Sequence, residues 1–252
     1  MNKFIIANWK MYYGPVKAGA WVRAFRRERL PKDIEIAIAV PSVSLAAARA
    51  SLGRATIPAL AAQDVFWEKE GAFTGEVSPS MLSEFGVSVC IIGHSERRQY
   101  LGETDEMVGK KAAALQKAGI LPVICVGETA LQRSKGQAKK VVKAQVQKAI
   151  ADVKPDGKAP AVIAYEPVWA IGTGKACRAL DAKEMHDVIR DVISSEWGAR
   201  YRDEIRVIYG GSVNERNVGE YMTTTGIDGA LVGSSSLDPR TFALLCRASV
   251  PA

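Results

Sequence analysis

The chain has 252 residues, 48 % of them hydrophobic, and its 34 basic and 27 acidic residues give a net charge of +7. This length suits one large α/β domain or two small ones, and the apolar fraction is ample for a core. No apolar run approaches the roughly 20 residues of a membrane span, and the first residues lead directly into a strand-like segment without the layout of a signal peptide. We therefore expect no membrane partner.

The charge and the cysteines limit the classes of function further. A positive net charge would suit nucleic acid or a small anion. The basic residues are spread along the chain, apart from Arg23, Arg26, Arg27 and Arg29 on one expected helix, so nucleic acid is not expected as a partner. The four cysteines lack the pairing of a metal site and the density of a disulfide-rich domain. We expect reduced thiols, a cytoplasmic location, and neither a metal nor a cofactor.

Strand and helix signals alternate from one end of the chain to the other. Strands are expected at Phe4–Trp9, Ile34–Val40, Ile57–Ala62, Val87–Ile92, Ile120–Val126, Ala161–Ala164, Ile205–Tyr209 and Gly229–Val232. Helix starts between them are marked by prolines in the first turn, N-cap residues or acidic residues. Capping-box spacing predicts two further helix starts, at Asp181 with Glu184 and at Ser212 with Glu215.

Two of the connections look like loops, and one helical region looks unusually long. Gln63–Val77, after the third strand, is a long loop, and Gly93–Gly102, after the fourth, is polar and dense in charge. The region after the fifth strand is rich in lysine and predicts helix to about Val153.

The pattern amounts to eight βα units without a Gly/Ser linker, so residues 1–252 are expected to form a single domain. The length matches the roughly 250 residues of a (β/α)8 barrel. A doubly wound sheet is the alternative α/β fold, but the Gly-x-Gly-x-x-Gly fingerprint after the first strand that would favour it is missing. In a barrel all post-strand loops gather at one face, so the chemistry is expected there.

The segment after the sixth strand is the strongest candidate for chemistry. It reads Ala164-Tyr165-Glu166-Pro167-Val168-Trp169-Ala170-Ile171-Gly172-Thr173-Gly174-Lys175-Ala176. The proline holds Glu166 in an extended conformation at the strand mouth, and the glycines permit unusual backbone angles after an apolar strip. These features predict a base followed by a mobile lid. A surface loop with a solvated glutamate is the alternative.

Further polar groups follow the first and fourth strands. Lys10 would place a positive charge in the barrel mouth, next to Asn8, while His94 would face the same opening as Glu166. Glu96 could pair with Lys10 or with Arg97, or act on a substrate hydroxyl. Each has an ordinary alternative: a solvated lysine, a turn-capping asparagine, a structural histidine, or a surface ion pair.

Small residues follow the seventh and eighth strands, in Gly210-Gly211-Ser212 and in Gly233-Ser234. Backbone N–H groups in such turns bind phosphate, and these are the loops where barrels commonly hold one. Tight connections are the alternative explanation. Cys125, at the end of the fifth strand, is expected to be a buried packing residue.

Together these motifs resemble the triosephosphate isomerase family. The matching runs are Asn8-Trp9-Lys10, Gly93 to Arg98, Ala164 to Lys175 and Tyr209 to Ser212, in the family's order and across essentially the whole chain. The resemblance implies interconversion of dihydroxyacetone phosphate and glyceraldehyde 3-phosphate, a homodimer, and a place in glycolysis and gluconeogenesis.

The resemblance also implies a role for each matching residue. Glu166 corresponds to the base, His94 to the group that polarises the carbonyl with help from Asn8, Lys10 to the substrate-binding cation, and Glu96 to a glutamate beside them. Backbone amides of Gly172, Ser212, Gly233 and Ser234 correspond to the phosphate site, and Val168–Lys175 to the closing lid. The base, a neutral histidine and lid closure are established features of that family.

The resemblance further places the dimer contact in the loop Gln63–Val77, with Thr74 reaching the partner's site. Its Phe66, Trp67 and Phe73 would be costly to leave exposed.

The chain departs from the family pattern in three places: Ser234 stands where a second glycine is usual, Ala176-Cys177 where Thr-Ala is usual, and Asp64 where an asparagine is usual. The first two touch phosphate binding and lid motion, and none touches the proton-transfer groups. Two other functions remain open, a barrel that binds without turnover and another phosphate-handling barrel enzyme such as an aldolase. An aldolase needs a Schiff-base lysine inside the barrel, and no expected strand interior offers one.

Overall fold

Eight parallel strands close into a barrel in the computed structural model, which describes residues 1–157, 160–171 and 176–250. Each strand pairs with the next along the chain, and β1 pairs with β8. The strands are β1 Lys3–Asn8, β2 Ile34–Val40, β3 Ala59–Ala62, β4 Val89–Ile92, β5 Leu121–Val126, β6 Val162–Tyr165, β7 Arg206–Tyr209 and β8 Gly229–Val232. The (β/α)8 prediction is confirmed. The doubly wound alternative is wrong because an open sheet has two edge strands, whereas the pairing of β1 with β8 gives every strand here two neighbours.

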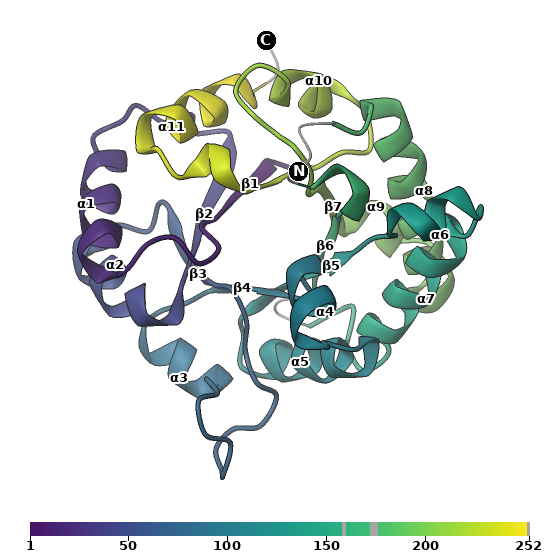
Figure 1. The fold of residues 1–252 in the computed structure, drawn as a ribbon, viewed down its shortest axis with the longest axis horizontal. Helices are drawn as coiled ribbons and strands as arrows, with labels where there is room; N and C mark the ends of the chain where they lie inside the picture. The colour runs from purple at the N-terminus through teal and green to yellow at the C-terminus, as the bar shows by residue number, and fades with distance from the viewer. Residues whose placement is uncertain (158–159, 172–175, 251–252) are drawn as a thin grey trace.

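Helices surround the barrel in a ring, as Figure 1 shows. They are α1 Pro15–Phe25, α2 Leu45–Leu52, α3 Pro79–Glu84, α4 Ser95–Leu101, α5 Asp105–Lys117, α6 Ala130–Ser134, α7 Ala138–Ile150, α8 Ala179–Trp197, α9 Tyr201–Glu204, α10 Val218–Thr223 and α11 Pro239–Ala248. Short 3₁₀ turns lie at Ser42–Ser44, Val168–Ala170 and Ser234–Ser236. No helix among the described residues is both long and apolar enough to cross a membrane.

The strands alternate between two apolar layers because successive side chains point to opposite faces of a sheet. Phe4, Ile6 and Ala164 belong to the cluster inside the barrel, while Ile5 and Ala7 belong to the larger cluster between strands and helices. Continuing the inward phase by two residues reaches Asn8 from Ile6 and Glu166 from Ala164. This alternation therefore aims both polar residues toward the mouth of the barrel.

The segment Gly93–Gly102 was expected to be a loop, and this prediction is wrong, since it contains α4. The ring of His94 accepts a hydrogen bond at the start of the helix, and Gly102 ends it in the left-handed conformation with φ 67°. Histidine is not among the usual N-cap residues. The local sequence therefore gave no start signal.

The two capping-box predictions are also wrong. Helix α8 begins at Ala179, before Asp181, whose carboxylate pairs with Arg178 at 2.7 Å instead of capping the helix. Helix α10 begins only at Val218, and the hydroxyl of Ser212 donates to the Ala170 carbonyl at 2.7 Å. In both cases the side chain that the spacing assigned to a cap bonds to another partner, which is Arg178 at the start of the same helix for Asp181 and the Ala170 carbonyl for Ser212.

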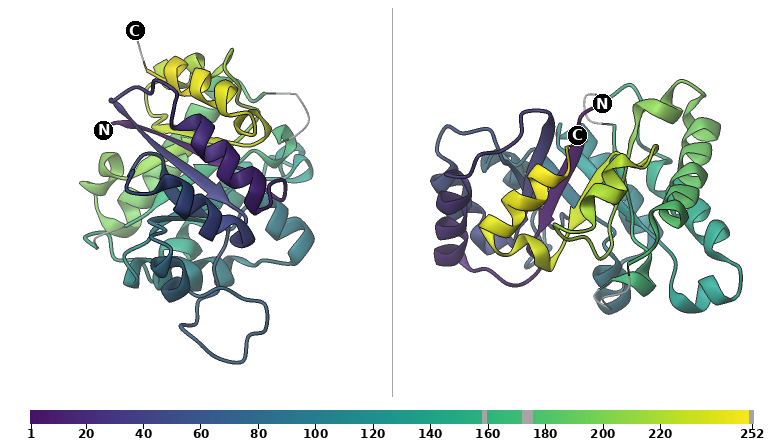
Figure 2. Two further views of the ribbon diagram at one scale, coloured as in Figure 1. Left: turned by 90° about the vertical axis from the view of Figure 1, so that its left-hand side faces the viewer. Right: turned by 90° about the horizontal axis from the view of Figure 1, so that it is seen from above.

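The loop that follows β3 protrudes from the rest of the molecule. In Figure 1 and in the left view of Figure 2 it projects beyond the ring of helices. Its residues 71–76 are all exposed, and Phe66 stacks on Trp67 and packs against Phe73, with ring centroids 4.0 and 4.5 Å apart. The projection leaves this loop available for contact with another molecule.

Candidate active site

A cavity of about 400 Å³ opens at the carboxyl ends of the strands. Most of the predicted site residues line it together, although they come from five different strand ends. Its lining comprises Asn8, Lys10, Tyr12, His94, Glu166, Ile171, Gly210, Gly211, Ser212, Val213, Asn214, Leu231, Gly233, Ser234 and Ser235. Glu96 is not in this lining and reaches the site through Lys10.

The carboxylate of Glu166 is buried at the floor of the site, with 4 % of its side chain exposed. Its Oε2 accepts from the Ser95 backbone N–H at 3.0 Å, and its Oε1 lies 3.1 Å from His94 Nε2. Two glycines make room for it: a Cβ on Gly127 would lie 1.8 Å from the Glu166 carbonyl oxygen, and one on Gly210 would lie 2.8 Å from its Cγ. The base candidate is thus held by specific hydrogen bonds and tight backbone packing.

Glu166 and His94 act on one another's pKa. Burial raises the pKa of Glu166, but the neighbouring His94, the Ser95 N–H and Lys10 hold it below its ordinary value. Burial lowers the pKa of His94, but the Glu166 carboxylate outweighs this effect and raises it. The carboxylate is therefore ionised at neutral pH, as a base must be.

The hydrogen bonds define where the proton on the His94 ring lies. Nδ1 accepts from the Glu96 backbone N–H at 3.3 Å, so in this arrangement Nδ1 carries no proton. A single proton on Nε2 then faces the Glu166 carboxylate. This arrangement matches a neutral ring that donates from Nε2, and a donor on Nδ1 opposes formation of the charged ring.

Replacing Glu166 by glutamine is expected to lower the pKa of His94. The Glu166 carboxylate, which raises this pKa most, is lost. Burial and the Glu96 N–H remain, beside the smaller raising effect of the Glu96 carboxylate, so the ring stays neutral to lower pH than in the parent. NMR of the ring nitrogens between about pH 5 and pH 8 measures it, and the chain has only two histidines to assign. A His94 pKa in the variant equal to or above the parental one would contradict this prediction.

Lys10 is fixed through both its backbone and its side chain. It has φ 50°, in the left-handed region that non-glycine residues rarely occupy. Its N–H donates to Asn8 Oδ1 at 3.0 Å, and its carbonyl accepts from Gln63 Nε2 at 2.9 Å. Its Nζ lies 2.5 Å from Glu96 Oε1. Asn8 thus caps its own turn and lines the cavity as well, and Glu96 pairs with Lys10.

The turns after β7 and β8 supply the small residues of the cavity wall. A Cβ on Gly233 would lie 3.5 Å from Lys10 Cε, so this turn approaches the lysine side chain closely. Ser234 begins a 3₁₀ turn and does not adopt a positive φ, so serine there carries no left-handed strain. Gly172, the remaining residue predicted for phosphate binding, lies outside the described residues.

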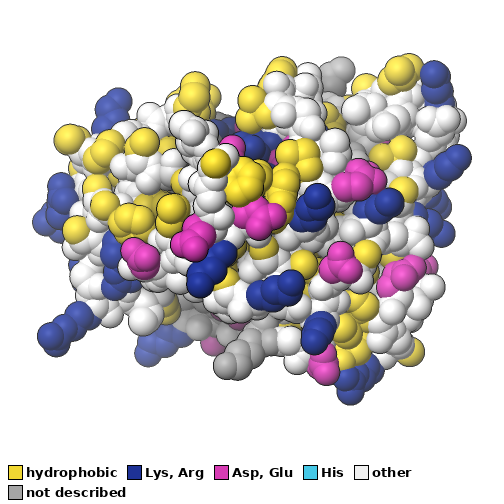
Figure 3. All heavy atoms as spheres, turned by 90° about the horizontal axis from the view of Figure 1, so that it is seen from below, with side chains coloured by type: hydrophobic (Ala, Val, Ile, Leu, Met, Phe, Trp, Pro, Cys, Tyr) yellow, Lys and Arg dark blue, Asp and Glu magenta, His cyan; other side chains and the backbone are white. Residues whose placement is uncertain are grey.

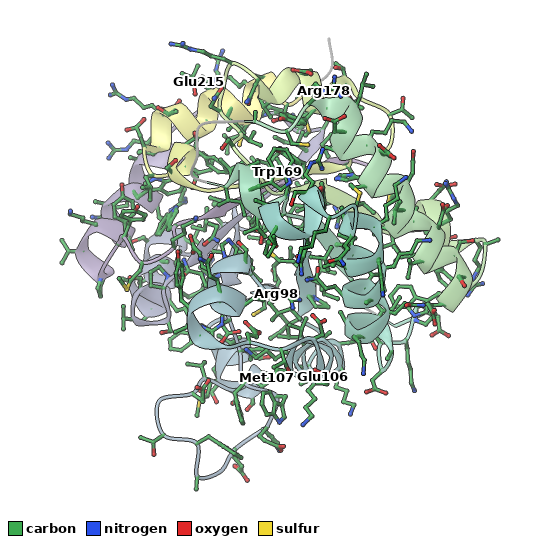
Figure 4. All side chains as sticks on the ribbon, turned by 45° about the vertical axis from the view of Figure 1, so that its right-hand side comes forward. Arg98, Glu106, Met107, Trp169, Arg178 and Glu215 are labelled. Atoms are coloured by element: carbon green, nitrogen blue, oxygen red, sulfur yellow. The ribbon has the colours of Figure 1, made fainter. Side chains whose placement is uncertain are left out.

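The start of the predicted lid packs against the protein. Val168–Ala170 form a 3₁₀ turn, and Trp169, labelled in Figure 4, donates from Nε1 to the buried carboxylate of Glu128 at 2.8 Å. The guanidinium of Arg133 lies 4.5 Å from the Trp169 ring centroid. The rest of the predicted lid, 172–175, lies outside the described residues.

Sequence reasoning missed residues that act on the site through distant contacts. Gln63 holds the backbone of Lys10, Glu128 holds Trp169, and Gly127 makes room for Glu166. Gly127-Glu128 directly follows β5, a position at the barrel mouth that could have indicated a role. Cys125 is buried, as predicted.

The second histidine, His186, is fully buried in α8. Burial lowers its pKa to about 3, so it is a neutral packing residue.

Comparison with known proteins gives a family match over nearly the whole chain. The family model described as triosephosphate isomerase matches residues 3–249. Triosephosphate isomerases of Streptococcus thermophilus (strain ATCC BAA-491 / LMD-9) and Thermoanaerobacter sp. (strain X514) are each 46 % identical to the chain, over 243 and 244 residues. The matches cover 96 % of this chain and 96 % and 98 % of the respective relatives.

Proposed function

The chain belongs to the triosephosphate isomerase family, and we propose that Glu166, His94, Lys10 and Asn8 carry out its reaction in the cavity at the barrel mouth. The chain is an isomerase that interconverts dihydroxyacetone phosphate and glyceraldehyde 3-phosphate, a step of glycolysis. The convergence of these four side chains on one cavity carries the assignment. An isomerase assay of the purified chain, beside variants of these residues, tests it.

In this proposal Glu166 moves the proton. Its ionised carboxylate removes the proton from the carbon next to the carbonyl, which leaves an enediolate, and then returns a proton to the neighbouring carbon. Both of its oxygens contact Ser95 and His94 in this structure, so the carboxylate must exchange at least one of these contacts for the substrate. Its lowered pKa keeps it ready to accept a proton at neutral pH.

His94 and Lys10 stabilise the negative charge that develops on the substrate oxygens. Once Glu166 turns to the substrate, the main influence that raises the His94 pKa is gone, and burial with the Glu96 N–H favours the neutral ring. A neutral ring can donate from Nε2 and recover its proton within one cycle. The Lys10 ammonium, fixed by Glu96, supplies a preorganised positive charge beside it.

The segment Val168–Lys175 serves as a lid over the bound phosphate. An enediolate phosphate in open water can eliminate its phosphate, and a closed lid excludes water and strengthens electrostatic interactions inside the site. The backbone amides of Gly172, Ser212, Gly233 and Ser234 bind the phosphate in this proposal. Ser212 also supports it by holding the Ala170 carbonyl of the lid.

Replacing Ser234 by glycine is expected to change KM by no more than about tenfold, or 1.4 kcal/mol. The backbone N–H that binds phosphate is kept, and the φ of Ser234 gives no strain for glycine to relieve. A phosphate-bearing substrate analogue, used as an inhibitor beside the parent, separates phosphate binding from turnover. A change above about a hundredfold in either direction would show that Ser234 has been misplaced in the phosphate site.

We also propose a homodimer formed through the loop Gln63–Val77. A second cavity of about 660 Å³ lies beside the active site and is lined in part by Asn8, Lys10 and Glu96. Exposed hydrophobic side chains lie in the loop, where Phe73 is exposed, and line this cavity, where Met11, Tyr100 and Leu101 are exposed. Figure 3, which views the molecule from below Figure 1, shows hydrophobic side chains among charged ones on the side where the loop projects. A projecting loop beside a cavity fits exchange of loops between two copies.

The intact protein is expected to sediment as a dimer at micromolar concentration. Docking of the loop would remove Phe73, 42 % exposed in the single chain, from water, and would bring Thr74 near the partner's Asn8 and Lys10 positions. A monomer at that concentration would contradict the proposal, and would leave the aromatic packing of Phe66, Trp67 and Phe73 as a property of the loop by itself.

The proposal also covers the number of domains in the chain and its location in the cell. We infer that residues 1–252 form one domain, because a barrel closes only when β1 and β8 pair. A cytoplasmic location agrees with the four cysteines, all of which are buried free thiols.

A further inference from the structure

Two segments far apart in the sequence hold Lys10 from different sides. From the end of β3, Gln63 Nε2 donates to the Lys10 carbonyl at 2.9 Å and to the Ala39 carbonyl at 3.0 Å. From the first turn of α4, Glu96 Oε1 lies 2.5 Å from Lys10 Nζ. Because Lys10 has a strained backbone with φ 50°, its position depends on such external support.

The next residue of each segment ties the two segments together. Asp64, directly after Gln63, places its Oδ2 2.8 Å from Nη2 of Arg97, directly after Glu96. Two buried side chains complete a ring of four charged groups. Asp64 Oδ1 lies 2.7 Å from Lys111 Nζ, and Lys111 Nζ lies 2.8 Å from Glu103 Oε1. Glu103 Oε2 in turn lies 3.0 Å from Arg97 Nε. The ring contains two carboxylates and two cations.

Two members of the ring, Lys111 and Glu103, are buried, and their burial fixes the position of the ring in the protein. Side chains of Lys111 and Glu103 are 2 % and 1 % exposed, whereas Asp64 and Arg97 are 18 % and 31 % exposed and line the cavity beside the active site. Asp64 and Arg97 therefore connect the buried Lys111–Glu103 pair to Gln63 and Glu96, which contact Lys10.

We propose that Asp64 is a positioning residue for Lys10, acting through its ion pair with Arg97. The inference rests on the proposed role of Lys10 as the substrate-binding cation. The carboxylate contacts Lys111 through one oxygen and Arg97 through the other. An asparagine, usual in the family at this position, has one acceptor oxygen and turns an N–H₂ group toward one of the two cations. In this chain the charge of Asp64 holds both.

Asp64→Asn is the central variant, and Asp105→Asn is its matched control. Asp105 also pairs with an arginine of α4, Arg98, labelled in Figure 4. Arg98 otherwise donates to the carbonyls of Gly93 and Cys125, so that pair lies outside the support of Lys10. We expect Asp64→Asn to weaken binding of a phosphate-bearing substrate analogue by about three- to tenfold, and Asp105→Asn to leave it within about twofold.

A double-mutant cycle separates positioning from general stability. Arg97→Gln breaks the same ion pair from its other end and provides a second variant if Asp64→Asn folds poorly. We expect the loss of analogue binding in the double variant to be smaller than the sum of the two single losses, because both changes remove the same Asp64–Arg97 ion pair. The parent, both single variants and the double variant are compared in the same oligomeric state, with melting temperature measured in parallel.

Three results would overturn the inference: unchanged analogue binding in Asp64→Asn and Arg97→Gln, additive losses in the double variant, or an equal loss in Asp105→Asn. A Lys10→Met variant distinguishes failure of the Asp64 inference from failure of the proposed function. If Lys10→Met binds the analogue like the parent, Lys10 is not the substrate-binding cation, and the inference is wrong as well. If Lys10→Met loses binding while Asp64→Asn does not, the inference alone is wrong.

Discussion

Replacing Glu166 by glutamine is expected to lower kcat by roughly 10²–10⁴-fold, the usual cost of losing a general base. Glutamine keeps the size of the side chain, and its carbonyl oxygen can still accept from the Ser95 N–H, which contacts Glu166 Oε2 at 3.0 Å. What it loses is the ability to take a proton from carbon. The loss should therefore appear in kcat, measured by a coupled isomerase assay in both directions.

Analogue binding provides the control for this variant. If the site is intact, Glu166→Gln should bind a phosphate-bearing substrate analogue within about threefold of the parent. In the proposed site the analogue is bound mainly by Lys10 and by the backbone amides of the turns after β7 and β8. A variant whose kcat stays within about threefold of the parent would remove Glu166 from the role of base.

Replacing Lys111 by methionine is expected to destabilise the protein by about 3–5 kcal/mol, the range seen when one partner of a buried ion pair is removed. The Lys111 ammonium lies 2.7 Å from Asp64 Oδ1 and 2.8 Å from Glu103 Oε1, with only 2 % of its side chain exposed. Methionine matches its length but leaves two carboxylates facing one another, with Arg97 as their remaining cation. Chemical denaturation measures the change in the free energy of unfolding.

Lys139→Met is the matched control for this stability prediction. Lys139 lies 2.6 Å from Glu184, but the two side chains are 58 % and 61 % exposed. An exposed pair of this kind contributes about 0–1 kcal/mol. Equal losses in the two variants would show that burial of the Lys111 pair has no special effect, contrary to the expectation.

The barrel could be predicted from the sequence because its signals are repeated and local. Each strand is a short apolar run, each is followed by a helical segment, and the length fits eight such units. The sequence also predicted that Asn8 and Glu166 lie at strand ends, and the structure adds that each continues the inward phase of its strand by two residues. Element bounds were less certain, and the strand expected at Ile57–Ala62 begins only at Ala59.

What the sequence could not show are contacts between distant residues. Helix α4 was missed because its cap is the His94 ring, and the charged residues that follow look like a loop. The capping boxes were wrong because a spacing pattern does not reveal that the Ser212 hydroxyl bonds to the Ala170 carbonyl. Gln63 reaches Lys10 across 53 positions of sequence, and no local pattern encodes that bond.

The proton transfer assigned to Glu166 can be observed directly by running the isomerisation of glyceraldehyde 3-phosphate in D₂O. A carboxylate that removes a proton from C2 and returns one to C1 can exchange it with solvent in between. The parent is expected to form dihydroxyacetone phosphate that carries deuterium at C1, detected by NMR, while Glu166→Gln binds the substrate analogue but forms labelled product at a rate lower by roughly 10²-fold or more. Parental labelling rates in Glu166→Gln, or no turnover by the parent, would contradict the assignment.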